Sequence, residues 1–234
     1  MAVKPPHAKG STELDPLTVA REFFEVFGGG PLPAWDEFAH AVSPEYYPAG
    51  KVIFDVDEEH PFVYVVLRGA VKIVASDAAG SNHLVGLARA GELVASIQAL
   101  APAGLGHFVD QDLLGAGWSA GAARGTTDTK AVTLMQTLVG RVDFRDVHSM
   151  MTQHGGAWAV VVFNAVAHYA MVEEHRARQL LMLTAEDRYR HFLRRYPDLL
   201  GVLPQKDIGS YIGVTPVGIS RIASRVREEA RRGN

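Results

Sequence analysis

The residues best suited to chemistry lie in a short helical pattern between Pro216 and Val226. Its outer side is small, polar or basic, and its inner side is apolar. The outer residues are Val217, Ser220, Arg221 and Ser224, and the inner residues are Ile219, Ile222 and Val226. A guanidinium such as that of Arg221 can donate two parallel hydrogen bonds to a guanine edge, and a small apolar side chain such as Val217 can touch a thymine methyl group. The pattern predicts a helix that reads base edges in the major groove.

The sequence before this helix predicts a second, shorter helix and a tight turn that would position it. Pro204 suits a helix start, because its φ is already helical. Gly213 suits a left-handed position after the last residue of that helix. Thr215 can cap the next helix with its hydroxyl group, and Pro216 suits its first position. The two helices together predict a helix-turn-helix, although an ordinary helical hairpin would give a similar pattern.

Charge is distributed unevenly along the chain. From Arg176 onward there are 12 Lys+Arg and 6 Asp+Glu, about +6, whereas the remainder has 11 and 20, about −9, giving the net charge of −3. A basic segment attached to an acidic body is typical of a DNA-binding module at one end of a chain. The candidate phosphate contacts are Gln205, Lys206, Thr215 and Arg225.

Two stretches resemble one family of regulators. The run from Ile208 through Thr215-Pro216 to Ser220-Arg221-Ile222 resembles the DNA-binding segment of the cyclic-AMP receptor protein / fumarate-nitrate regulator (Crp/Fnr) family. The lead-in from Glu186 to Pro204 resembles that of many members. The family often has a glutamate where this chain has Val217, and a larger residue where it has Gly218. The resemblance implies DNA binding, and these two departures leave the target sequence open.

Composition excludes several classes of protein. Nearly half of the 234 residues are hydrophobic, which excludes a disordered chain, and there are no cysteines, which excludes disulfides and thiolate-bound iron–sulfur clusters. We expect a cytoplasmic protein without a signal peptide or membrane span. We find no nucleophile–base motif, phosphate loop or metal spacing, so we predict neither an enzyme nor a metal site. Six histidines could bind haem or metal in principle, but packing or surface roles are favoured for them: His83, His107, His148, His154, His168 and His175.

The central part of the chain predicts an antiparallel β sandwich or jelly-roll barrel, because short strands alternate with Gly/Pro turns. Expected strands include 62–67 and 70–75, joined as a hairpin at Arg68-Gly69, then 83–88, 90–93 and 130–135. Helices are expected from Asp15-Pro16 and from Pro33, and a short one at 142–147. The motifs Pro48-Ala-Gly50 before Phe54, and Gly91-Glu92-Leu93, resemble the cyclic-nucleotide-binding domain of the same family.

In that family the glutamate of the Gly-Glu-Leu element binds the ribose of the nucleotide, and an arginine binds the phosphate. The resemblance places the glutamate at Glu92, with Ser96 in the following short helix, but an ordinary turn carboxylate is the alternative. The arginine position falls at Trp118 or Ser119, and Arg124 is the nearest arginine. A buried phosphate needs a cation. We therefore do not expect ordinary cyclic AMP or GMP as the effector and assign no cofactor; the barrel could hold another small ligand or none.

A long helix is predicted from about 157 to 183. Apolar and amphipathic residues recur there at alternating four- and three-residue spacing, which favours a helix pair, although packing on its own barrel is the alternative. The predicted dimer seam is Val161, Ala165, His168, Val172, His175 and Gln179.

The expected architecture is α+β. It comprises a tail (1–15), a cyclic-nucleotide-binding-like sensor domain (16–150), a dimerisation helix (151–183) and a helix-turn-helix domain (184–234). The expected function is that of a homodimeric Crp/Fnr-type transcription regulator; the alternative is a ligand-sensing or interaction module with a degenerate DNA-binding domain. Expected partners are a near-palindromic DNA duplex, a second copy of the chain, RNA polymerase and a small-molecule effector, and no membrane.

Overall fold

The computed structural model describes residues 15–77, 79–100 and 126–232. The chain forms two compact units, one of residues 1–73 with 87–165 and one of residues 74–86 with 166–234. The residues predicted to form the long helix contribute to both units.

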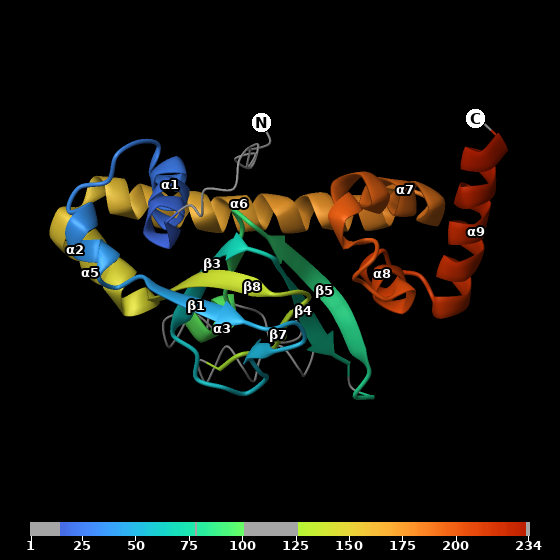
Figure 1. Ribbon diagram of the computed structural model, residues 1–234, viewed down its shortest axis with the longest axis horizontal. Coiled ribbons are helices and arrows are strands. Elements are labelled where there is room, and N and C mark those ends of the chain that lie inside the picture. Colours follow the sequence, from blue (N-terminus) through green and yellow to red (C-terminus); the bar gives the residue numbers. More distant parts are fainter. Residues whose placement is uncertain (1–14, 78, 101–125, 233–234) are drawn as a thin grey trace. The chain divides into compact units, whose positions relative to one another are not determined.

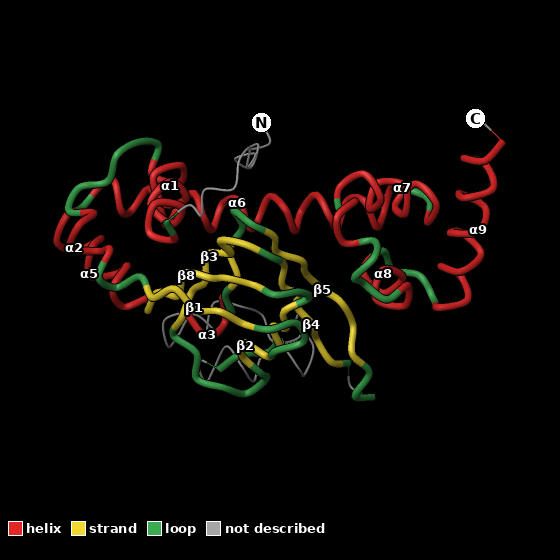
Figure 2. The backbone as a smooth tube through the Cα atoms, viewed as in Figure 1, coloured by secondary structure: helices red, strands yellow, loops and turns green. Residues whose placement is uncertain are grey.

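Two four-stranded sheets form the β part of the chain (Figure 1; Figure 2). The first has the order β1 (Ser43–Tyr47), β8 (Thr137–Asp143), β3 (Phe62–Arg68), β6 (Leu93–Val94). The second has the order β2 (Val52–Phe54), β7 (Lys130–Thr133), β4 (Ala70–Ser76), β5 (Asn82–Arg89). Pairing is antiparallel between β1 and β8, β3 and β8, β3 and β6, and β2 and β7. This confirms the predicted antiparallel sandwich.

The predicted hairpin at Arg68-Gly69 is wrong, because β3 and β4 belong to different sheets. Gly69 has a φ of +94°, and a Cβ placed on it would lie 2.7 Å from the carbonyl oxygen of Gln136 and 2.6 Å from Oγ1 of Thr137. Only glycine accommodates both the positive φ and this close approach. Gly69 therefore forms a corner at which the chain crosses from one sheet to the other.

The sequence patterns also failed to predict β1 and β8. Pro44 lies in β1 and cannot donate to a ladder, but β1 is at the edge of its sheet, where proline is tolerated. The first four residues of β8 are all buried, so the strand lacks the alternation that marks a half-exposed strand. The short helix expected from Val142 instead begins at Phe144, because Asp143 caps α5 (Phe144–His154) by accepting a 2.9 Å hydrogen bond from the Arg145 N–H.

Helices pack on the first sheet in the first unit. They are α1 (Pro16–Gly28), α2 (Trp35–Ala39), α5 and the first part of α6 (Gly156–Met182). Asp15 caps α1 as predicted, accepting from the Thr18 N–H at 3.1 Å. Aromatic rings fill the interface: the Phe38 and Trp158 centroids are 4.5 Å apart, and the Trp158 indole N–H donates to the carbonyl oxygen of Pro33 at 3.0 Å. A separate apolar cluster, which includes Phe54, Tyr64 and Val139, lies among strands of both sheets.

The bounds of α6 agree with the predicted long helix. Among the residues that the structure describes, α6 is the one helix long and apolar enough, by length and composition, to cross a membrane, and 11% of its most apolar window is buried.

The second unit contains a compact set of helices after α6. These are α7 (Ala185–Arg195), the 3-10 turn η2 (Pro197–Leu199), α8 (Gln205–Tyr211) and α9 (Pro216–Arg232). Their shared core is made of fully or nearly fully buried side chains: Phe192, Leu199, Leu203, Ile208, Ile212, Ile219, Ile222, Ala223 and Val226. Their apolar faces therefore meet in one core, which leaves the polar faces outward.

Candidate nucleic-acid interface

The turn between α8 and α9 has the conformation that the sequence predicted. Gly213 has a φ of +70°. The Gly213 N–H donates to the Ser210 carbonyl oxygen at 3.1 Å, and the Val214 N–H donates to that of Gly209 at 2.9 Å. These two bonds are a Schellman motif, which satisfies the last carbonyl groups of α8 and turns the chain sharply. The backbone geometry of this turn therefore fixes the direction of α9 relative to α8.

The start of α9 is also fixed. Thr215 Oγ1 accepts from the Gly218 N–H at 3.1 Å, and Pro216 is the first helical residue. Both capping predictions are confirmed. While its oxygen caps the helix, the Thr215 hydroxyl group still has its hydrogen free to donate to another group, such as a phosphate oxygen.

Gly209 allows α8 and α9 to approach each other closely. A Cβ at this position would lie 3.0 Å from Cγ2 of Ile219 and 3.3 Å from the carbonyl oxygen of Val214. Ile219 is 1% exposed, so it has little room to move. The close spacing of the two helices thus depends on having a glycine, which lacks a Cβ, at position 209.

The residues predicted to read bases lie together on the outer side of α9. Val217 is 63% exposed, and Ser220, Arg221 and Ser224 are exposed as well. Gln205 and Lys206, predicted to contact phosphate, are exposed in the first turn of α8. The arrangement offers hydroxyl, amide and guanidinium donors together with one apolar side chain, which are the groups that contact base edges and phosphates.

The two predicted arginines of α9 differ in their surroundings. Arg221 has no ion-pair or hydrogen-bond partner among the residues that the structure describes. Arg225 donates from Nη1 to Glu186 Oε2 at 3.1 Å. Glu186 also accepts from Arg190 Nη2 at 3.0 Å, and Arg190 pairs in turn with Glu229 of α9. Only Glu186–Arg190 has helical i, i+4 spacing, so the α7–α9 pairs cannot be predicted from residue spacing.

Arg188 is a second residue whose role the sequence did not predict. Its Nε donates to the carbonyl oxygen of Ile212 at 2.7 Å, and its Nη1 donates to those of Leu183 at 2.7 Å and Leu180 at 3.4 Å. These carbonyls lie at the ends of α8 and α6, where no helical N–H is available. Arg188 therefore ties together the end of the long helix, α7 and the helix-turn-helix.

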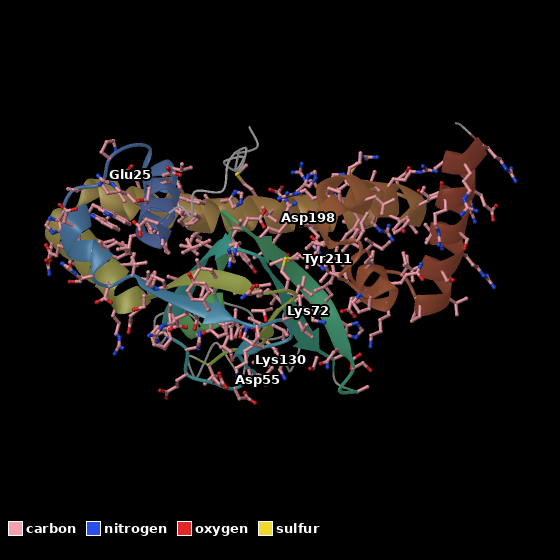
Figure 3. The ribbon with its side chains drawn as sticks, in the orientation of Figure 1. Glu25, Asp55, Lys72, Lys130, Asp198 and Tyr211 are labelled. Carbon is pink, nitrogen blue, oxygen red and sulfur yellow. The ribbon has the colours of Figure 1, made fainter. Side chains whose placement is uncertain are left out.

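Tyr211, the last residue of α8, makes further contacts within the second unit. Tyr211, labelled in Figure 3, has its hydroxyl oxygen 3.2 Å from that of Tyr196, and the Arg176 guanidinium lies 4.7 Å from its ring centroid. Within the same unit, Ser210 Oγ accepts from the Leu84 N–H at 3.1 Å, and Arg176 donates to the Val85 carbonyl oxygen. The segment 74–86 thus makes polar contacts with α8 through Ser210 and with α6 through Arg176.

The predicted ligand residues are only partly described. Glu92 Oε2 accepts from the Arg89 N–H at 2.9 Å, and Glu92 Oε1 lies 4.0 Å from Arg89 Nη2. Ser96 is 2% exposed, and its Oγ accepts from the Ala99 N–H at 3.4 Å at the start of α3 (Ile97–Leu100). Ser119 and Arg124, like Trp118, lie outside the described residues. Glu92 thus has a local role in its turn, whatever else it binds.

The predicted dimer seam on α6 is mixed. Val161 is 3% exposed and packs within its own chain, where a Cβ on Gly28 would lie 3.3 Å from Val161 Cγ2. Val172 is 47% exposed, and His175 Nε2 accepts a hydrogen bond from Gln179 Nε2 at 2.7 Å. Ala165 is partly buried and His168 is exposed. The seam therefore begins inside the first unit and reaches the surface only farther along the helix.

No three His, Cys, Asp or Glu side chains gather closely enough to hold a metal ion within residues 15–77, 79–100 and 126–232. Lys130 and Asp55, labelled in Figure 3, form a 2.7 Å ion pair beside the β2–β7 pairing. This lysine and this aspartate thus neutralise each other locally.

No family model and no curated protein matches the sequence. The fold is similar to that of the c-di-GMP responsive global regulator CLP of Xanthomonas campestris, with a TM-score of 0.58 and 13% identity over 83% of this chain and 91% of that one. It is also similar to FixK2 of Bradyrhizobium japonicum (TM-score 0.53, 19% identity, 81% and 86% covered). A third similar structure is that of a CooA mutant from Carboxydothermus hydrogenoformans, with a TM-score of 0.56 and 12% identity over 81% of this chain and 78% of that one.

The structural similarity establishes the fold alone, so the function has to be inferred from the residues of the site. The chain combines the antiparallel sandwich, the long helix and the helix-turn-helix in the same order as its sequence motifs predicted. It has the fold of the Crp/Fnr regulators.

Proposed function

We propose that this protein is a cytoplasmic, homodimeric transcription regulator of the Crp/Fnr type that binds double-stranded DNA through α8 and α9. One observation carries the proposal: a Schellman turn and a capped second helix hold Val217, Ser220 and Arg221 together on one exposed side. An ordinary helical hairpin has no need for hydrogen-bond donors such as Ser220 and Arg221 on the exposed side of its second helix. The similarity of the fold to that of known regulators supports the same function.

Electrostatics supports DNA as the partner. The residues from Arg176 onward carry about +6, while the remainder of the chain carries about −9. A duplex would be attracted to the basic segment and repelled by the acidic body, so it would be oriented as it approached. Gln205 and Lys206 would contact phosphates and fix the register of α9, and Arg221 would read a guanine.

The surface of α6 supports the homodimer. On the side of α6 that carries the predicted seam, Val172 is 47% exposed and Met182 is 79% exposed, and other large apolar side chains, such as Phe163 at 71%, are exposed elsewhere around the helix. Monomeric proteins rarely leave so much apolar surface open, and such surface usually marks an interaction site. A second copy of α6 is the partner proposed, since a two-fold dimer would place two copies of α9 about one helical turn of DNA apart. Changing Val172 to Glu should then convert a dimer to a monomer in analytical ultracentrifugation.

The proposed effector differs from ordinary cyclic AMP or GMP. Glu92 already accepts from its own turn, and Trp118 or Ser119 stands where the family has an arginine. In the proposed mechanism, an effector or a partner protein bound by the sensor domain shifts the paired helices and reorients the two helix-turn-helix segments. Calorimetric titration of the purified protein with cyclic AMP and cyclic GMP should give no binding heat.

The deciding experiment is a salt series of DNA binding. The full chain is titrated into a fluorescent random-sequence duplex and into duplexes selected from that pool for tight binding. A regulator should show affinity that falls steeply with salt and a preferred sequence with two related half-sites. A module with a degenerate DNA-binding domain, which Val217 and Gly218 would favour, should show weak binding and no selected sequence.

A further inference from the structure

Four charged side chains on α7 and α9 alternate in sign along one edge of the helix-turn-helix. Arg225 donates to Glu186 at 3.1 Å, Glu186 accepts from Arg190 at 3.0 Å, and Arg190 pairs with Glu229. Arg225 and Glu229 belong to α9, and Glu186 and Arg190 belong to α7. We call this set the α7–α9 charge network; its net charge is zero.

The exposures of the side chains within this network are unequal. The Glu186 side chain is 25% exposed and that of Arg190 is 34%, whereas that of Arg225 is 62%. Arg190 binds both carboxylates, so Glu186 keeps a partner even when Arg225 leaves it. Arg225 is therefore the member that can exchange its partner at the smallest cost.

Arg225 lies one helical turn beyond Arg221 on α9, close to the side that carries Val217, Ser220 and Ser224. A carboxylate and a phosphate present similar oxygen acceptors to a guanidinium, and arginine binds either with charge-assisted hydrogen bonds. In the free protein the Glu186 carboxylate thus binds Arg225 through the kind of contact that a phosphate oxygen can also make. Arg221, in contrast, has no such internal partner among the described residues.

We propose that Glu186 is an internal counter-charge that competes with DNA phosphate for Arg225 and thereby lowers the affinity of the protein for every duplex. The inference rests on the proposed DNA-binding function and names a residue that tunes it. On binding, Arg225 exchanges the Glu186 carboxylate for a phosphate oxygen, and Glu186 remains with Arg190. Since phosphates carry no sequence information, this exchange reduces affinity equally for preferred and random sequences.

The test compares Glu186→Gln with the original chain on a random-sequence duplex of about 40 base pairs, long enough for two half-sites. Glutamine keeps the size of the side chain and removes its charge. An exposed ion pair contributes up to about 1 kcal/mol, so affinity should rise about two- to five-fold. The rise should be the same on selected duplexes, so that the ratio of the two affinities is unchanged.

Two controls isolate the contact. Glu229→Gln removes the same charge from the same network but contacts Arg190 instead of Arg225, and it should give a clearly smaller rise. In an Arg225→Gln background, Glu186→Gln should have no further effect, because the competition no longer exists. Equal rises for Glu186→Gln and Glu229→Gln, or an undiminished rise in the Arg225→Gln background, would mean a general charge effect and would overturn the proposal.

The outcomes separate this inference from the proposed function. If the original chain binds duplexes with steep salt dependence but Glu186→Gln gains nothing, only the inference fails. If no form binds DNA, the proposed function fails and the inference falls with it. Glu186→Ala serves as a second variant, and circular dichroism melting of each variant verifies that the helices are intact before affinities are compared.

Discussion

Arg188 in α7 donates from Nε to the carbonyl oxygen of Ile212, 24 residues later, over 2.7 Å. The same guanidinium donates to the Leu183 carbonyl oxygen at the end of α6. One side chain thus satisfies backbone acceptors from two helix ends that have no N–H partner of their own. Any tilt of the helix-turn-helix relative to the end of α6 has to stretch or break these bonds.

Replacing Arg188 with alanine should therefore destabilise the second unit. Hydrogen bonds to a charged group contribute about 1.5–3 kcal/mol, and part of this set is solvent-exposed, so we expect a loss of about 1–3 kcal/mol in the free energy of unfolding. Urea unfolding followed by far-UV circular dichroism measures it. Arg194→Ala, on the exposed side of the same helix, is the matched control and should change stability by less than about 0.5 kcal/mol. Equal effects of the two variants would contradict the role given to Arg188.

Gly209→Ala should also be destabilising, although alanine favours helix by about 1 kcal/mol. The new methyl group would lie 3.0 Å from Ile219 Cγ2, and overpacking costs about 1–3 kcal/mol, so the steric term should win. The melting temperature should fall, and Gly209→Val should lower it further. Gly201→Ala meets nothing within 4 Å and serves as the control. In an Ile219→Ala background, which lacks the Cγ2 atom of the close contact, Gly209→Ala should no longer lower the melting temperature. An unchanged or raised melting temperature for Gly209→Ala in the original chain would show that α8 and α9 can separate enough to accept the methyl group.

Arg221 and Lys206 should differ in what they contribute to DNA binding. Arg221→Ala should cost about 1–3 kcal/mol on the preferred duplex and much less on random duplexes, because its expected partner is a base. Lys206→Ala should weaken binding to both by a similar factor and make the salt slope shallower by about one. The measurement is fluorescence anisotropy at several salt concentrations. If both variants weaken random and preferred duplexes equally, α9 does not read bases through Arg221.

His60 should make the first unit sensitive to acid. Its side chain lies 3.1 Å from the Tyr64 hydroxyl oxygen, and burial lowers the pKa of His60 from 6.5, with Arg141 lowering it further and Glu58 opposing. As the pH falls through about 6.5, His60 therefore binds a proton in the unfolded chain but not yet in the folded chain. The contribution of neutral His60 to the free energy of unfolding is thus fully present above this pH and is lost as the pH falls below it.

The loss due to His60 should be at most about 1.4 kcal/mol per pH unit. Urea unfolding at about pH 7.5 and about pH 5.5 measures it, and His60→Gln should flatten the dependence. His191, whose pKa is also lowered by burial, belongs to the second unit, and His191→Gln is the control for titration elsewhere. A pH dependence that His60→Gln leaves intact would contradict this assignment.

The sequence predicted features that depend on neighbours in the chain. The Gly213 turn, the Thr215 cap and the extent of α6 follow from φ preference, side-chain capping and periodicity, all of which are local. It could not assign β3 and β4 to separate sheets, because a two-residue turn signal does not state which strands pair. It also missed the contact of Arg225 with Glu186, since residues 39 apart in sequence meet only through the packing of α7 on α9.

The pairing of β1 with β8 has a consequence for how the chain folds. Ser43 faces Arg141 across the ladder, and Phe62 of β3 faces Asp143. The first sheet therefore cannot close until β8 has left the ribosome, whereas α7, α8 and α9 pack with near neighbours and can form quickly. Until then β1 and β3 lack the strand that lies between them, and their free edges can pair with other chains. Interruption of synthesis before β8 should thus yield aggregates rather than a smaller folded domain.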